Sequence, residues 1–523
     1  MKKHNTYETL AYLIDQTALQ QGEKKAILFL KKGEIESQIT YSSLREISSR
    51  AANALIEMGL EKRDRVILLM SKSIEEVIFH LAVQKVGAIS VILNPGFKKD
   101  EMDYFLRDTG AKIVIVGKKQ QAFIRSIDQK MQTLSVDLES PFTQVKLFPD
   151  HSSQLLDKDA TPGDPALIIY TSGTTGQPKG AILTQQNLIQ DARNIIDRWE
   201  ITEKDVLCHA LPLFHVHGLC FALHTSLIAG ATIVMCHEFS AETGIDILSR
   251  QKGELACTLF MAVPTMYLKM MEKLKGERRD FSHLRLLASG SAPLLPKDFK
   301  RIKEVFGKEP VEREGMSETG MNFSNPLYGE KRPGSIGLPL PNVEVRIVNP
   351  ETFEDLKSGE VGEIWLRGPN VTPGYWRKPK ETEALFVKGW FRTGDLGKRD
   401  ETGYYYITDR LKHIIISGGE NISPKEIESV INQHANVSES CIVGIPDETW
   451  GEKVVAAVVL KPDVILAPKE IQDYCKHHLL DWKCPKEVFF LEELPKNKMG
   501  KIMKEEVTRL FLNLSPSHTT KHS

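Results

Sequence analysis

The sequence predicts an α/β fold, with a large N-terminal body of α/β subdomains and a small, mobile α+β C-terminal domain. Over the first part of the chain, apolar β-rich runs such as RVILLM and AKIVIV alternate with helix-like stretches such as SIEEVIFHLAVQKV. This alternation is typical of largely parallel sheets. After Leu411 the pattern changes to one helix and two strands, SESCIVGI and KVVAAVVL. A chain of 523 residues also exceeds one ordinary core, so several subdomains are expected.

Within the body, the run PALIIY at 165–170 is short, apolar and partly β-branched, as a buried strand would be. From Thr184 onward the spacing is helical, and the helix is expected to bury one face only. The buried face would hold Leu188, Ala192, Ile195, Ile196 and Trp199, and the wet face Asp191, Arg193 and Asp197. Residues 170–180, YTSGTTGQPKG, are therefore predicted to form a strand-to-helix loop.

The composition of this loop suits a polyphosphate. Its glycines, Gly173, Gly176 and Gly180, would let the backbone approach phosphate oxygens, and Lys179 supplies a mobile positive charge. Hydroxyl donors come from Ser172, Thr174 and Thr175. The spacing differs from that of the P-loop, which disfavours a nucleotide hydrolase of that type. A flexible surface loop is the alternative interpretation of the same residues.

The segment from Val206 to His237 contains no Asp, Glu, Lys or Arg and is long enough to cross a membrane. Its histidines, Pro212 and interior glycines favour buried strands and helices around a site instead. Farther on, HIIIS and a Gly-Gly turn lead into a helix that Ser423, Pro424 and Glu426 would start with a capping box and a proline at the first position.

The chain is thus divided into an N-terminal domain, 1–411, a C-terminal lid domain, 412–513, and a polar tail, 514–523, that is expected to be disordered.

Composition narrows the class of protein. The content of 41% hydrophobic and 26% charged residues describes a soluble globular enzyme. A net charge of −1 gives no electrostatic case for binding nucleic acid or an anionic membrane. The seven cysteines are scattered without a CxxC pair, so neither a disulfide framework nor a zinc site is indicated. No secretory signal is present at the start, and a cytoplasmic location is expected; oligomeric state is left open.

TSGTTGQPKG resembles the phosphate-loop signature of the acyl-adenylate-forming superfamily, which includes acyl-CoA synthetases. Further motifs that resemble those of the superfamily follow in order: LPLFHVHG at 211–218, SGSAPL at 289–294, GMSET at 315–319, RTGDLG at 392–397, DRLKHIIISGGENISPKEIE at 409–428 and PKNKMGK at 495–501. Because these matches are ordered and span more than three hundred residues, chance similarity is disfavoured even though each short motif alone is weak.

The resemblance implies an AMP-forming acid–CoA ligase that uses ATP, Mg²⁺ and coenzyme A. The carboxylate of the acid attacks the α-phosphate of ATP, pyrophosphate leaves, and the acyl-AMP then meets the CoA thiol. The first half-reaction brings anionic groups together, so positive charges and hydrogen-bond donors carry most of the catalysis.

The resemblance also assigns roles to single residues. Lys501 would bridge the carboxylate and the α-phosphate, although from local composition alone it would be a solvated surface lysine. Glu318 resembles the magnesium ligand, with Thr171 and Thr319 near phosphate or metal. Asp395 resembles the ribose-binding acid, supported by Arg410; a surface ion pair is the alternative for these two.

The remaining roles concern the acid, the purine and the moving domain. His215 would lie near the carboxylate and the thiol path, and the HxH pattern at 215–217 is expected to line the acyl site rather than to bind metal. Lys412 matches the hinge, and Gly418 and Gly419 lie in a segment expected to face CoA. The loops around the nucleotide comprise Gly290, Ser291, Ala292, Pro293, Glu314, Gly315, Met316 and Ser317.

The chain departs from the family at three positions. Glu314 replaces the Tyr or Phe whose ring stacks on adenine, so either the carboxylate is a tolerated variant or nucleotide binding is weakened. His413 replaces an Asp common just after the hinge. The segments at 320–347, 212–218 and 261–267 look especially like the malonyl-CoA synthetase branch. In the segment that matches 263–269, that branch uses an arginine for the second carboxylate of malonate where this chain has Lys269.

Malonate or a related short acid is therefore the favoured substrate. A medium- or long-chain fatty acid is the second choice. An adenylation protein that loads a carrier protein, and a non-catalytic acyl or nucleotide sensor, are alternatives from other classes.

Overall fold

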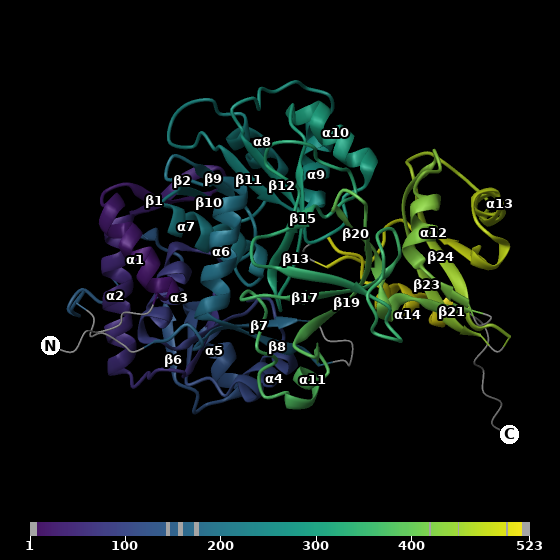
Figure 1. Ribbon diagram of the computed structural model, residues 1–523. Coiled ribbons are helices and arrows are strands. Elements are labelled where there is room, and N and C mark those ends of the chain that lie inside the picture. The colour runs from purple at the N-terminus through teal and green to yellow at the C-terminus, as the bar shows by residue number, and fades with distance from the viewer. Residues whose placement is uncertain are drawn as a thin grey trace. The chain divides into compact units, whose positions relative to one another are not determined.

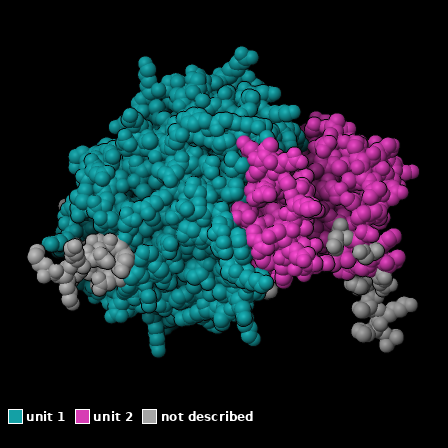
Figure 2. Space-filling model, viewed as in Figure 1, with its two compact units in different colours: residues 1–344, 366–391 teal, residues 345–365, 392–523 magenta. Residues whose placement is uncertain are grey.

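The computed structural model describes residues 8–142, 147–154, 160–171, 177–417, 420–447, 449–497 and 500–514. The chain forms two compact units, one made of residues 1–344 and 366–391 and the other of residues 345–365 and 392–523 (Figure 2). The domain boundary predicted between residues 411 and 412 is the position of a hinge. A division into compact units does not locate a hinge, so this boundary stays a prediction. The predicted residues Ser172 to Gly176, Gly418 and Gly419, and the tail from residue 515, lie outside the described residues.

A six-stranded sheet, in the order β6-β5-β3-β4-β7-β8, lies in the large unit (Figure 1). All neighbours in it are parallel except β7 and β8, which are antiparallel. Its strands are β3 Arg65–Leu69, β4 Ile89–Ile92, β5 Ile113–Gly117, β6 Thr133–Val136, β7 Pro165–Thr171 and β8 Lys179–Thr184. The helices in this part of the chain are α3 Ile74–Val86, α4 Lys99–Thr109, α5 Lys118–Ile127 and α6 Gln185–Trp199.

A nine-stranded sheet, in the order β15-β14-β13-β12-β11-β9-β10-β1-β2, lies in the same unit. Its centre is parallel, and β2, β14 and β15 pair with their neighbours in antiparallel fashion. Its strands are β1 Lys25–Lys31, β2 Glu34–Thr40, β9 Val206–His209, β10 Thr232–Cys236, β11 Leu259–Ala262, β12 Leu286–Ser289, β13 Val311–Met316, β14 Gly320–Ser324 and β15 Leu338–Pro339.

The other elements of the large unit include the helices α1, α2 and α3, which gather at one end of it and pack on one another (Figure 1). The remaining bounds are α1 Leu10–Gln21, α2 Tyr41–Glu57, the π-helix η2 His217–His224, α7 Thr225–Ala229, α8 Ala241–Leu248, α9 Pro264–Leu274, α10 Pro296–Phe306, α11 Pro379–Glu383 and β18 Phe386–Val387. The segment from Val206 to His237 forms β9, η2, α7 and β10 and is largely buried, as expected. None of the helices in the described part of the chain is both long and apolar enough to cross a membrane.

The second unit is built around the strand pair β23 Val437–Asp447 and β24 Gly451–Leu460, in a sheet of order β22-β21-β24-β23 with β25 paired to β24. Alternate side chains of β24 enter two hydrophobic clusters, Val454, Ala456 and Val458 in one and Val455 and Ala457 in the other, as the two-residue period of a strand requires. The other elements are β21 Ile415–Ser417, β22 Glu420–Ile422, α12 Pro424–Ile431, α13 Pro468–His478, η4 Asp481–Lys483, β25 Glu487–Phe490 and α14 Lys504–Leu514.

Further strands of this unit precede that sheet. They are β16 Glu344–Val348, β17 Gly362–Arg367, β19 Trp390–Arg399 and β20 Tyr405–Arg410, followed by the 3-10 turn η3 Leu411–His413. Strands β19 and β20 are antiparallel and place Asp395 opposite Arg410. The predicted α/β class, with a large N-terminal body and a smaller C-terminal α+β part, is confirmed. Ser423 caps α12 with Pro424 in its first turn as expected, but the Glu426 carboxylate, which was expected to complete a capping box, accepts from Nζ of Lys483 at 2.7 Å instead.

Two local predictions are wrong. The loop at 170–180 is not a strand-to-helix loop, because KGAILT forms β8, which pairs with β7 from Pro165↔Thr184 to Thr171↔Lys179 before α6 begins. Asp191 does not lie on a wet face either; it is 3% exposed, whereas Arg193 and Asp197 are exposed. Helix α6 packs against η2, α7 and β14, so more of its circumference is buried than the apolar stripe alone indicates.

Candidate functional site

The predicted phosphate loop joins two antiparallel strands. Thr171 and Lys179 are paired across the strands, and the Thr171 hydroxyl donates to the carbonyl of Lys179 at 3.4 Å. The glycine at 180 is required by packing in the sheet, because a Cβ there would lie 2.6 Å from Cγ2 of Ile168. Thr171 is thus the last residue of β7 and Lys179 the first residue of β8. The predicted phosphate-binding residues between them, 172–176, lie outside the described residues.

Tyr375 brings two predicted site residues together. Its hydroxyl donates to Oε1 of Glu318 at 2.8 Å, and Nζ of Lys179 lies 5.6 Å from the centre of its ring. Burial and the Glu318 carboxylate raise the pKa of Tyr375, so the phenol stays a hydrogen-bond donor. Sequence reasoning missed Tyr375; it lies eleven residues before β18 in no recognised motif, and only the folded contact reveals it.

Glu318 and Thr319 are held by backbone and amide contacts. Glu318 is 8% exposed, and its carbonyl accepts from the backbone N–H of Thr372 at 2.7 Å. Thr319 is fully buried; Nδ2 of Asn322 donates to its hydroxyl at 2.7 Å, and Nδ2 of Asn370 donates to its carbonyl at 2.6 Å. Glu318 and the threonine hydroxyls are hard oxygen donors, which fit Mg²⁺. In the described ranges no group of three or more His, Cys, Asp or Glu side chains is placed to hold a metal, so substrate oxygens and water would complete its coordination.

The predicted adenine position is occupied by a carboxylate with partners of its own. Glu314 lies on β13, half-buried, and its Oε2 accepts from Nδ2 of Asn322 at 3.1 Å. Gly315 follows at a shift in the β13–β14 register, where a Cβ would lie 2.6 Å from the carbonyl oxygen of Gly320. Met316 and Ser317 are half-buried beside them. The loop of Gly290, Ser291, Ala292 and Pro293 follows β12, and Ser291 adopts a left-handed φ of 67°.

A buried arginine that the sequence analysis did not select lies beside this loop. Arg313 is 4% exposed, its Cζ lies 4.9 Å from the centre of the Phe221 ring, and its Nη2 donates to Oγ of Ser291 at 3.3 Å. Its Nε is buried and has no hydrogen-bond partner. The close approach to Gly290 requires a glycine, since a Cβ at 290 would lie 2.6 Å from Nε of Arg313. The available signal in the sequence was an arginine just before the GMSET motif.

His217 completes this group, which we call the acid cluster: Arg313, Ser291 and His217. The Nδ1 atom of His217 lies 3.1 Å from Oγ of Ser291, and its buried Nε2 has no hydrogen-bond partner. Burial lowers the pKa of His217 well below its usual value, and the charge of Arg313 lowers it further, so the imidazole is neutral. The cluster therefore presents a cation and a neutral imidazole, and one nitrogen of each, Nε of Arg313 and Nε2 of His217, lacks a hydrogen-bond partner.

The other predicted acid-binding residues occupy different surroundings. His215 is half-buried, its ring contacts that of Phe214, and burial lowers its pKa to about 4. Lys269 lies on α9 and is exposed. Its role toward a second carboxylate stays a prediction, whereas Arg313 is the buried cation of this region.

In the second unit, four predicted residues interact electrostatically: Asp395, Arg410, Lys412 and Lys501. Nε of Arg410 lies 2.8 Å from Oδ1 of Asp395, which is 4% exposed. Burial raises the pKa of Asp395 against the opposing charges of Arg410, Lys501 and Lys425. Asp395 is therefore a buried carboxylate. Arg410, its partner in the ion pair, is partly exposed, so the pair does not lie wholly at the surface.

The backbone N–H of Lys501 donates to Oδ1 of Asn497 at 3.0 Å. Loss of surrounding water lowers its pKa to about 8. Arg410 and Lys412 lower it further and Asp395 opposes them, although the residue as a whole is exposed. Lys412 lies in η3, and partial burial lowers its pKa. His413, also in η3, has its pKa lowered to about 4 by burial and by neighbouring cations.

Known proteins resemble this chain over almost its full length. The family model for AMP-binding enzymes matches residues 14–376, and the model for the C-terminal domain of AMP-binding enzymes matches residues 426–501. The oxalate–CoA ligase of Arabidopsis thaliana is 34% identical over 97% of this chain and 99% of its own length. The mitochondrial malonate–CoA ligase ACSF3 of Bos taurus is 34% identical over 90% of this chain and 86% of its own.

The crystal structure of ATP-bound MatB from Rhodopseudomonas palustris has a TM-score of 0.90 and 35% identity, and the match covers 96% of this chain and 99% of that one. The chain belongs to the AMP-binding enzyme family. The predicted superfamily is confirmed, and so are its acyl-CoA synthetase class and the likeness to the malonyl-CoA synthetase branch.

Proposed function

We propose that this protein is an ATP-dependent, AMP-forming acid–CoA ligase that works through an acyl-AMP and takes malonate or a related short dicarboxylic acid. The observation that supports this substrate most directly is Arg313. It is a buried guanidinium whose Nε has no hydrogen-bond partner, next to a neutral His217 with an unpartnered Nε2. The carboxylates of Glu314 and Asp191 act on the charge of Arg313, but a buried donor also needs an acceptor, and a second carboxylate on the substrate supplies one.

The first half-reaction follows from the chemistry of the residues. One carboxylate of the acid attacks the α-phosphate of ATP, the bond to the β-phosphate bridging oxygen breaks, and pyrophosphate leaves. We assign Lys501 to the carboxylate and the α-phosphate, and Lys179, Thr171 and the loop 172–176 to the β- and γ-phosphates. Glu318 and Thr319 would hold Mg²⁺, which neutralises phosphate charge when bound. These fixed charges act by positioning and by electrostatic stabilisation.

The remaining assignments complete the nucleotide and the second step. Asp395 accepts hydrogen bonds from the ribose hydroxyls, with Arg410 holding its carboxylate in place. The purine lies against residues 290–293 and 314–317. In the second half-reaction the CoA thiol attacks the acyl carbon and AMP leaves. Lys412 acts as the hinge between the half-reactions, His215 lines the path of acid and thiol, and Gly418 and Gly419 contribute backbone toward CoA; Lys269 is assigned to the outer end of the acid.

The competing substrates make different demands on the site. A long alkyl chain would leave Nε of Arg313 without a hydrogen-bond acceptor, which disfavours fatty acids. Transfer to a carrier protein would need no CoA, and a sensor would bind without turnover. We also propose a cytoplasmic location, because all seven cysteines are free and buried, as suits a reducing compartment; fractionation of cells tests it against the mitochondrion.

A pyrophosphate-release screen tests the proposal. The acids are malonate, acetate, octanoate, palmitate and coumarate, each with and without CoA. Malonate is expected to give the fastest CoA-dependent turnover. A preference for octanoate or palmitate would overturn the substrate assignment, CoA-independent turnover that a carrier protein accelerates would indicate carrier loading, and the absence of release with every acid would indicate a sensor.

A further inference from the structure

Lys72 links the two sheets of the large unit at the carboxyl ends of their strands. It follows β3 of the six-stranded sheet by three residues, and His209 is the last residue of β9 in the nine-stranded sheet. Nζ of Lys72 donates to the carbonyl of Leu211 at 2.8 Å and to that of His209 at 3.3 Å, and it lies 3.4 Å from Nδ1 of His209. An ammonium carries three donors, and these three acceptors engage all of them.

His209 carries the connection onward to the far end of the segment 211–218. Its Nε2 lies 2.8 Å from the carbonyl oxygen of Gly218 and must donate to it, which leaves Nδ1 as the acceptor for Lys72. The ends of the segment also touch each other, because a Cβ at 218 would lie 2.1 Å from the carbonyl oxygen of Pro212. Lys72 and His209 together hold the start and the end of residues 211–218.

This segment carries the acid-binding histidines. His215 lies within it, and His217 begins the π-helix η2 and approaches Ser291 of the acid cluster. π-Helices are rare and occur often at functional sites. The position of η2 depends on where its first residues, His217 and Gly218, lie. A shift of the segment would move His217 away from Ser291 and Arg313.

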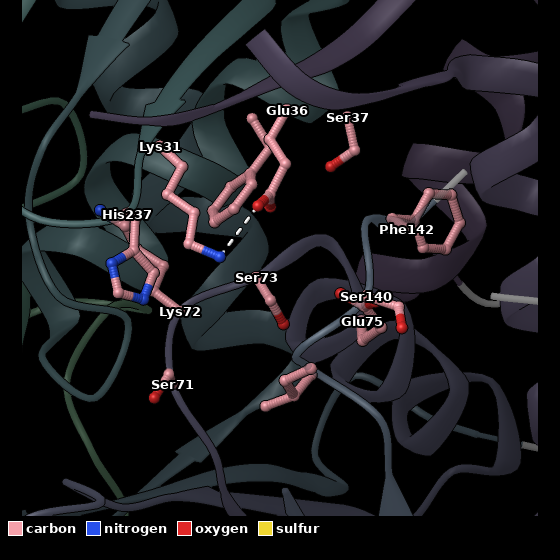
Figure 3. Close-up of a pocket in the computed structure, with 12 residues that line it drawn as sticks. Lys31, Glu36, Ser37, Ser71, Lys72, Ser73, Glu75, Ser140, Phe142 and His237 are labelled. Carbon is pink, nitrogen blue, oxygen red and sulfur yellow. Dashed lines mark hydrogen bonds and ion pairs between the residues drawn. The ribbon is translucent and has the colours of Figure 1, made fainter. Parts of the chain in front are cut away.

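The surroundings of Lys72 make the charged form of its ammonium less favourable than in water. Loss of water lowers its pKa to about 8. Lys72 also lines a small cavity of about 40 Å³, together with Lys31, Ser71, Ser73 and His237 (Figure 3). Burying an ammonium is unfavourable unless its hydrogen bonds are satisfied, and here the acceptors that satisfy them belong to the entry of the 211–218 segment.

We propose that Lys72 and His209 are positioning residues for acid binding, which set the conformation of residues 211–218 and thereby the place of His217 in the acid cluster. The inference rests on the proposed function of that cluster. Neither residue is assigned a contact with substrate.

The first test separates acid binding from ATP binding. Lys72→Met is expected to raise KM for malonate about tenfold or more, the size expected from lost charged hydrogen bonds, with KM for ATP changed less than about twofold. Lys72→Arg keeps the charge and should restore part of the affinity. The matched control is Lys85→Met on α3, where the removed ammonium binds Asp15 at 2.7 Å instead; it should leave KM for malonate unchanged.

His209 offers a second pair of variants in case Lys72→Met folds poorly. His209→Gln can place an amide donor where Nε2 lies and should keep most of the affinity for malonate, whereas His209→Asn reaches only the position of Nδ1 and should lose it. Equal losses in the two variants, or a loss in Lys85→Met as large as that in Lys72→Met, would overturn the positioning role.

Hydrogen exchange of the unliganded protein tests the same inference without turnover. The amides of residues 211–219 should exchange about tenfold faster in Lys72→Met and His209→Asn than in the wild type, while Lys85→Met leaves them unchanged. Unchanged exchange in the first two variants would overturn the inference. If the wild type activates no acid, the proposed function fails, and exchange still decides whether Lys72 and His209 hold the segment.

Discussion

The hydroxyl of Tyr375 donates a hydrogen bond to Oε1 of Glu318 at 2.8 Å, while the face of the same ring lies 5.6 Å from Nζ of Lys179. One side chain thus orients the proposed magnesium ligand and contacts the proposed phosphate lysine. Partners of this kind fix the direction of a metal ligand and affect affinity without touching the metal.

We therefore expect Tyr375→Phe to raise the Mg²⁺ concentration needed for half-maximal pyrophosphate release by about tenfold, within the range found for such partners. Titration of Mg²⁺ at saturating ATP and acid measures it. Tyr328→Phe, which alters a residue that is 68% exposed, serves as the control. An unchanged Mg²⁺ requirement in Tyr375→Phe would remove Tyr375 from the site.

Arg313 should set the preference for a dicarboxylic acid. Arg313→Met is expected to raise KM for malonate roughly a hundredfold, because truncating one partner of a buried charge pair leaves the other unpaired. KM for acetate should change far less. Arg313→Lys keeps the charge without the planar geometry and should lie between wild type and Arg313→Met. Equal losses for malonate and acetate would mean that Arg313 has only a structural role.

Gly290→Ala should disturb Arg313 without unfolding the protein. The new Cβ would lie 2.6 Å from Nε and 2.7 Å from Cζ of Arg313, so the guanidinium must shift. KM for malonate is expected to rise about tenfold, with little change in the midpoint of thermal unfolding. Gly218→Ala is the contrasting variant: its Cβ would meet the backbone oxygen of Pro212 at 2.1 Å, and the midpoint should fall by several degrees. Both midpoints are measured by calorimetry.

Lys501 should make acyl-AMP formation dependent on pH. With a pKa lowered to about 8, the amine is charged below that pH and neutral above it, so the step that needs its charge should decline from about pH 7 to 9. Lys501→Ala should abolish acyl-AMP formation and spare conversion of supplied acyl-AMP to the thioester. Lys501→Arg should move the alkaline decline to higher pH if it retains activity. Equal loss of both half-reactions in Lys501→Ala would contradict the assignment.

Glu314→Tyr tests the departure at the adenine position. Stacking of a base on an aromatic ring is worth about 1–3 kcal/mol in single-strand binders, so the variant is expected to bind ATP about fivefold or more tightly. Glu314→Gln, which can still accept from Asn322, should show no such gain. ATP affinity is measured by calorimetric titration. Unchanged affinity in Glu314→Tyr would identify the glutamate as a tolerated variant.

The ordered motifs were readable from the sequence because each is a contiguous run of special residue types. The strand 165–170, the helix after Thr184, the cap at Ser423 and the buried character of 206–237 follow from local pattern, and all agree with the structure. The strand β8, KGAILT, was missed because it is short, and only its pairing with β7 makes it a strand. Asp191 was misplaced because the apolar stripe of a helix gives no information about polar positions that face another element.

The sequence by itself determined the family, the α/β class and the candidate residues Glu318, Asp395 and Lys501, because these lie in contiguous motifs whose spacing survives in the linear chain. Only the tertiary structure decided that Arg313 and His217 share Ser291, that Tyr375 joins Glu318 to Lys179, and that Lys72 holds the loop before η2. These contacts connect residues far apart in the chain and depend on burial and direction. Composition and periodicity do not specify which residues that are distant in the chain meet in the fold.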